Sequence, residues 1–190
     1  MLLIPFLVID NFGQTSRNSF EFESVLVFPK IVTRSWNNAG IELPAKTSYT
    51  PSLAVSFMYN IKTDLRKKYF FNISPGIILG EKYYSGFLLG FNFQKYIYDL
   101  WFINFGFLGK LTLAQEGGHN YNDAEFFRST IFFRLGNYIN KSIAVNINYT
   151  IPLNNNIYGK SYSHGYGLSN DVASTIYLRY MISFGIEITR

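Results

Sequence analysis

Apolar and polar residues alternate along most of the chain beyond Asn18, with a period of two residues. The longest run is Val172–Thr189, where large apolar side chains alternate with small, polar or charged ones. Successive side chains of a β-strand point to opposite faces, so this pattern predicts a strand with a different environment on each face. The pattern recurs in earlier segments: Ser19–Phe28, Ser52–Ile61, Tyr69–Leu79, Phe87–Lys95, Trp101–Leu113, Phe126–Leu135 and Ile143–Ile151.

The connections between these segments alternate in length. Residues 31–49, 115–125 and 152–171 form long connections and residues 80–86 a moderate one, whereas 62–68, 96–100 and 136–141 are short. Membrane-spanning barrels have short periplasmic turns and longer external loops. We therefore expect an antiparallel up-and-down barrel of about eight strands, with both termini periplasmic and the long loops facing outward.

The number of aromatic residues decides which face of such a barrel points outward. Phe, Tyr and Trp make up 19% of the chain, and charged residues only 15%. The interior of an eight-stranded barrel is only just wide enough for its own side chains. A soluble, lipocalin-like barrel would have to hold the aromatic rings inside, where they do not fit. The chain contains no charge-free apolar stretch of about 18 residues, so the sequence does not predict a membrane-spanning helix. The sequence thus predicts an all-β transmembrane barrel with its aromatic face in lipid.

Charges of both signs fall on the face predicted to line the lumen. Lone buried charges are costly, so we predict a paired polar core without a continuous wide pore. A gated or small-solute pathway is the alternative. The first and last strands pair when the barrel closes, which brings the acidic residues of the first strand close to the last. The predicted lumen charges are Glu21, Glu23, Lys110, Arg128, Arg134, Arg179 and Glu187.

Tyr and Trp gather near the predicted strand ends, as in the aromatic girdles of membrane barrels. Beside the short turns lie Tyr59, Tyr69, Tyr96, Tyr98, Trp101 and Tyr138. Beside the long loops lie Trp36, Tyr49, Tyr83, Tyr84, Tyr121 and Tyr158.

Candidate chemistry is sparse. The chain has no Cys and two His, His119 and His164, neither in a metal-binding spacing, so we expect no metal and no cofactor. His164, Ser169 and Asp171 are close in sequence, which suggests a hydrolase triad as an alternative. The lipid A deacylase barrels resemble this chain in size, but their motif places Ser two residues after the His. Tyr166 occupies that position here. We therefore expect no enzyme.

The N-terminal residues indicate how the chain is targeted, and its net charge indicates which partners it contacts. Residues 1–17 open on an apolar run and predict a signal peptide, with a buried N-terminal strand or plug as the alternative, which leaves 18–190 as a single barrel domain. The formal charge is +5, and the basic residues are scattered. We expect no nucleic-acid binding, and contact with anionic lipid headgroups instead.

From Ser19 to Arg190 the chain resembles the small outer-membrane β-barrel superfamily, such as the OmpA transmembrane domain and OmpX-like proteins. The resemblance rests on architecture, and it implies insertion into a Gram-negative outer membrane. It implies outer-membrane lipid and lipopolysaccharide as neighbours. The leading hypothesis is a barrel with a structural or interaction role, which includes that of a subunit of a larger outer-membrane complex. The alternatives are a lipid A acylhydrolase and a narrow, porin-like channel.

Overall fold

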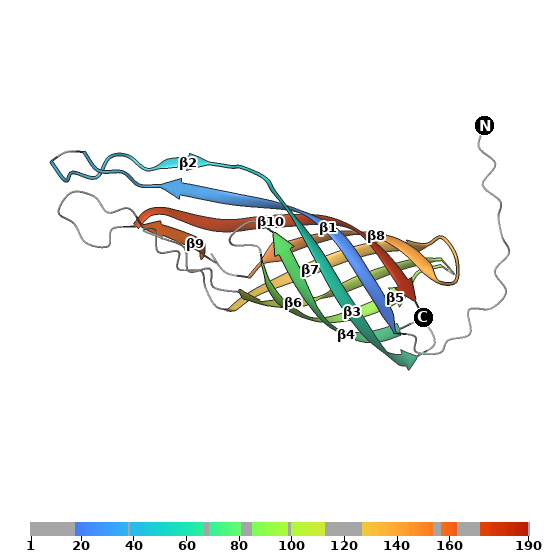
Figure 1. The fold of residues 1–190 in the computed structure, drawn as a ribbon. Helices are drawn as coiled ribbons and strands as arrows, with labels where there is room; N and C mark the ends of the chain where they lie inside the picture. The colour runs from blue at the N-terminus through green and yellow to red at the C-terminus, as the bar shows by residue number, and fades with distance from the viewer. Residues whose placement is uncertain are drawn as a thin grey trace, which may run out of the picture.

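The computed structural model describes residues 18–37, 39–66, 69–80, 85–98, 100–112, 127–153, 157–162 and 172–189, and these build an all-β structure (Figure 1). Within these ranges, no helix has the length and apolarity needed to cross a membrane. The strands are β1 (Ser19–Thr33), β2 (Lys46–Ser48), β3 (Ser52–Arg66), β4 (Tyr69–Gly80), β5 (Gly86–Tyr96), β6 (Trp101–Thr112), β7 (Phe127–Tyr138), β8 (Ile143–Pro152), β9 (Ile157–Tyr162) and β10 (Val172–Thr189).

Eight of these strands close into an antiparallel ring in the order β1-β3-β4-β5-β6-β7-β8-β10. The ring closes where β1 pairs with β10, from Ser19 opposite Thr189 up to Thr33 opposite Ser174. Every strand of the ring then has a hydrogen-bonded neighbour on both sides, which removes the open edges that lipid cannot solvate. The predicted all-β barrel of eight strands is confirmed.

The alternation of the sequence becomes an inner and an outer wall. Along β5, alternate residues are buried, while Phe87 and Phe93 between them point outward and are 53% and 60% exposed. Aromatic side chains of adjacent strands pack on the outer wall. Ring centroids are 4.9 Å apart for both Phe20–Tyr59 and Phe105–Phe133. Such cross-strand pairs stabilise the register of the sheet.

The barrel has two different ends. At the turn end, β3, β5 and β7 are joined to β4, β6 and β8 by residues 67–68, 97–100 and 139–142. Asn140 orders one of these turns, since its side-chain oxygen accepts from the backbone N–H groups of Ser142 and Ile143 at 2.8 and 2.9 Å. The first turn is shorter than the predicted loop 62–68, because β3 continues to Arg66.

A four-stranded sheet projects from the opposite, loop end, and we call it the blade (Figure 1). β1 and β10 continue past the ring, β2 pairs with β1 through Ile31–Thr33, and β9 pairs with β10. The order across the blade is β2-β1-β10-β9. The sequence pattern predicted only loops at 31–49 and 152–171. That prediction was incomplete, because β2 and β9 are short and form against the edges that the two long strands present.

Candidate functional site

The lumen is the candidate functional site, because it gathers the buried charges of the barrel. It is filled in three layers. At the turn end lies an aromatic cluster of Phe102, Tyr138 and Ala144, packed against Tyr96 and Leu100. A network of carboxylates, amides and cations occupies the middle. The loop end holds an apolar layer of Val25, Val27, Ala54, Met58, Ile78, Leu88 and Leu178.

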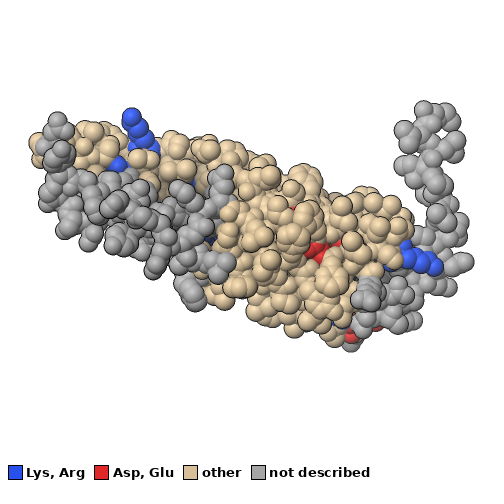
Figure 2. Space-filling view, in the orientation of Figure 1, with Lys and Arg blue, Asp and Glu red and all other residues tan. Residues whose placement is uncertain are grey.

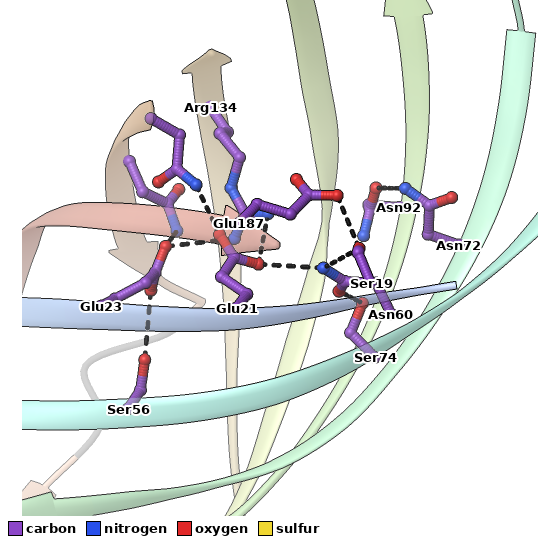
Figure 3. A network of polar contacts seen from close by, with 12 residues as sticks. Ser19, Glu21, Glu23, Ser56, Asn60, Asn72, Ser74, Asn92, Arg134 and Glu187 are labelled. Atoms are coloured by element: carbon purple, nitrogen blue, oxygen red, sulfur yellow. Dashed lines mark hydrogen bonds and ion pairs between the residues drawn. The ribbon is translucent and has the colours of Figure 1, made fainter. Parts of the chain in front are cut away.

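Arg134 organises the middle layer from the far side of the ring (Figure 3). It reaches from β7 to β1, donating through Nη1 to Glu21 at 2.7 Å and through Nη2 to Glu23 at 3.2 Å. Both carboxylates and the guanidinium are almost entirely buried. The two carboxylates also accept from neutral side chains: Asn60 and Asn148 donate to the same oxygens as Arg134, and Asn146 and Ser56 donate to the other oxygen of each carboxylate. These bonds come to Glu21 from Asn146 at 2.7 Å and Asn60 at 3.2 Å, and to Glu23 from Ser56 at 3.3 Å and Asn148 at 3.4 Å.

A second buried ion pair joins the network to the aromatic cluster. Glu21 and Glu187 lie directly opposite each other on β1 and β10, an unfavourable placement for two like charges. Lys62 of β3 pairs with Glu187, which also accepts from Ser19 at 2.6 Å. Lys62 also donates to the Tyr138 hydroxyl at 3.4 Å, and the Tyr96 hydroxyl donates to Tyr138 at 3.3 Å. The acids of β1 thus pair with the cation of β7, and the acid of β10 pairs with the cation of β3.

The predicted lumen charges are placed as follows. The side chains of Glu21, Glu23, Glu187, Lys110, Arg128 and Arg134 are buried inside the barrel. Four of them take part in the ion pairs above, in which Arg134 contacts the two acids of β1. Lys110 and Arg128 face each other on β6 and β7 and line the loop-end half of the lumen.

Arg179 is a correction, because the structure places it outside the lumen and exposes it. In the pairing of β1 with β10, Phe28 faces Tyr180 but Pro29 faces Leu178, so Arg179 is the extra residue of a β-bulge. Proline has no backbone N–H to donate to the ladder, which favours a bulge at this point. Beyond the bulge the faces are exchanged, and Leu178 is buried where simple alternation placed Arg179.

Lys62 and Tyr138 are site residues that the sequence reading missed. Lys62 lies in the predicted loop 62–68 and Tyr138 in the predicted aromatic girdle, yet both side chains are buried. The signal was present in the alternation, since Met58, Asn60 and Lys62 continue one inward-facing series along β3. A lysine directly after the predicted strand Ser52–Ile61 does not by itself indicate that the strand continues, and its partner Glu187 is distant in sequence.

The apolar layer leaves little free space in the lumen. The cavity there measures about 40 Å³ and lies between the apolar layer and the Arg134 network. That volume has room for about three water molecules. On the turn side of this cavity stand the ion pairs and then the aromatic cluster, whose Phe102 ring is completely buried.

The triad alternative cannot be placed in this arrangement. His164, Ser169 and Asp171 lie outside the residues that the structure describes, as do His119 and residues 1–17. Across the described ranges, no group of three or more His, Cys, Asp or Glu side chains is arranged to hold a metal ion.

No family model matches the chain, and neither does any curated protein. Among solved structures, outer membrane protein AlkL in lipid bilayers is similar over 100% of this chain and 97% of its own, with a TM-score of 0.52 and 12% identity. OprG from Pseudomonas aeruginosa covers 94% of this chain and 98% of its own at a TM-score of 0.49 and 8% identity. The likeness to AlkL is one of fold: the chain has the architecture of a small outer-membrane β-barrel.

Proposed function

We propose that this protein is an integral outer-membrane barrel without enzymatic activity and without an open pore, and that it presents the blade and the loops to partners at the cell surface. The observation that carries the proposal is the filled lumen, in which Arg134 joins Glu21 and Glu23 across the barrel above a buried aromatic cluster. A structural or interaction role then falls to the outer wall and the loop end.

The outer wall supports a location in lipid. In Figure 2 the barrel is mostly covered by uncharged side chains, acidic atoms show at one place in its middle, and Lys and Arg lie toward the two ends of the visible face. On β3 the outward series runs from Leu53 to Leu65 and is apolar or aromatic except at Thr63. With a rise of about 3.3 Å per residue and a strand tilt of about 40°, this series spans about 30 Å along the barrel axis. That height is comparable with the hydrocarbon core of a membrane.

The blade supports an interaction role. Its outermost strands, β2 and β9, each pair with one neighbour in the described sheet and offer backbone N–H and C=O groups at their other edge. Ile41 and Leu43, in the segment that leads into β2, are 62% and 42% exposed. Together these features provide a surface for a protein partner, as expected for a subunit of a larger complex.

We expect the purified barrel to produce no conductance steps in planar lipid bilayers. The charge network and the aromatic cluster lie in series along the lumen, and the cavity above them holds only about 40 Å³. Single-channel recording of the folded protein, beside an open porin as positive control, tests this. Reproducible discrete steps would instead favour the narrow channel.

We expect a short epitope tag inserted after Gly40 to be recognised by antibody on intact cells, and a C-terminal tag only after the outer membrane is permeabilised. Gly40 lies in an exposed turn of the blade, where its φ of 75° suits glycine and Asn37 accepts from the N–H groups of Ala39 and Ile41. β10 ends at the opposite, turn end of the barrel. The reverse labelling pattern would contradict periplasmic termini.

A further inference from the structure

The outer face of the β1–β10 seam carries two cations close together at the base of the blade. Lys30 follows Pro29 on β1 and continues the outward series of Phe22, Leu26 and Phe28. Its partner across the ladder is Tyr177, two residues from the bulged Arg179 of β10. Adjacent strands lie about 4.8 Å apart, so the two basic side chains leave neighbouring positions of the sheet.

Tyr49 fixes which face the Arg179 side chain covers. Ser48 and Lys46 of β2 pair with residues of β1 that belong to its inward-facing series, Ile31 and Thr33. The alternate residues of this segment, Thr47 and then Tyr49, therefore lie on the outer face with Lys30. The Arg179 guanidinium lies 4.9 Å from the centroid of the Tyr49 ring. This cation–π contact holds Arg179 over the outer face, and the N–H groups at the edge of the planar guanidinium can still donate hydrogen bonds.

A row of aromatic rings lies directly on the barrel side of these cations. Phe28 stacks on Tyr180 with ring centroids 4.5 Å apart, and Tyr180 lies 5.7 Å from Tyr149 of β8. Aromatic belts of this kind mark the boundary between the hydrocarbon and headgroup regions of a membrane. Lys30 and Arg179, one step beyond the row, are therefore at the level of lipid headgroups.

The local charge balance favours an anionic ligand. The acid that the structure describes in the blade is Glu42, and its carboxylate lies 3.7 Å from Arg34. We propose that Lys30 and Arg179 form a binding site for a phosphate group of lipid A, the lipid that faces the loop end if the orientation proposed above holds. Arg179 offers a fork of N–H donors that matches phosphate oxygens, and Lys30 adds a point charge. The aromatic row packs against the acyl chains of the same lipid.

Native mass spectrometry of the folded barrel in detergent tests this site, with diphosphorylated lipid A as the probe. We expect the variant Lys30→Ala/Arg179→Ala to bind lipid A about 25-fold more weakly, since each basic side chain near an anionic membrane surface contributes roughly a fivefold factor. The matched control Arg34→Ala/Lys46→Ala removes two cations from the same blade and is expected to bind as the wild type does. Heat-modifiable migration on gels establishes that both variants are folded.

Equal weakening by the two double variants would overturn the site, because it would reduce the effect to overall charge. Equal binding of lipid A lacking its phosphates would overturn phosphate recognition, and equal retention of phosphatidylglycerol would overturn the assignment to lipid A. Because the measurement uses detergent-solubilised protein, it does not depend on conductance or on labelling of intact cells. A failure here is therefore distinct from a failure of the proposed function.

Discussion

Replacement of Arg134 by alanine is expected to lower the free energy of unfolding by about 3–5 kcal/mol, because it leaves Glu21 and Glu23 buried without their shared cation. The guanidinium makes two bonds, at 2.7 and 3.2 Å, to carboxylates that are 2% and 3% exposed. Urea unfolding of the barrel in phospholipid vesicles, followed by tryptophan fluorescence, measures the loss. A combined Arg134→Ala/Glu21→Gln/Glu23→Gln variant should recover much of it, since the isolated negative charges are then removed.

Arg34 provides the matched control for this experiment. Its ion pair with Glu42 is longer, at 3.7 Å, and its side chain is 54% exposed. Exposed pairs of this kind contribute at most about 1 kcal/mol. We therefore expect Arg34→Ala to change the unfolding free energy only slightly. If Arg134→Ala were no more harmful than Arg34→Ala, the network would not be a major source of stability.

The second large effect is expected at Gly106, which lies on the inner wall of β6. A Cβ added there would lie 2.4 Å from the backbone oxygen of Phe91 and 2.4 Å from the Cβ of Asn92, its cross-strand partner. Backbone atoms of a closed ring cannot retreat from such a contact without disturbing the neighbouring ladders. We expect Gly106→Ala to destabilise the barrel by about 1–3 kcal/mol, as overpacking of a filled interior does.

Gly109, on the outer side of the same strand, is the matched control. The atom nearest to its added Cβ is in the ring of Phe127, at 3.0 Å, and that side chain is 55% exposed and can turn aside. We expect Gly109→Ala to change stability by no more than about 0.5 kcal/mol. Urea unfolding of the two variants under identical conditions provides the comparison. Equal effects would contradict close packing of the lumen at Gly106.

Much of the barrel could be predicted from the sequence because strand periodicity is a local property. In β5, Phe87 and Phe93 face outward, and Asn92 and Gln94 face inward, as alternation predicted. Glu21 and Glu187 also lie on the inner wall, as predicted from their positions in two strands that meet at the closure. Where strand boundaries depended on an end residue, the prediction was less accurate, and Lys62 was placed in a turn instead of in β3.

The bulge at Pro29 illustrates what alternation cannot show. A single extra residue exchanges the two faces, so Arg179 moved to the surface and Leu178 to the lumen. Nothing in the local pattern of β10 marks that position, because the cause lies in the paired strand. The blade is a similar case, since β2 and β9 form only where β1 and β10 extend past the ring and present edges.

The sequence by itself determined that the chain forms strands, that these strands have one aromatic and one polar face, and that the aromatic face points outward. Each of these follows from side-chain spacing and volume within short segments. Only the tertiary structure decided which charges meet. Arg134 contacts acids 113 and 111 residues away, and Lys62 an acid 125 residues away. Those partners are set by ring closure, strand register and the reach of side chains across the lumen, which are properties of the assembled barrel.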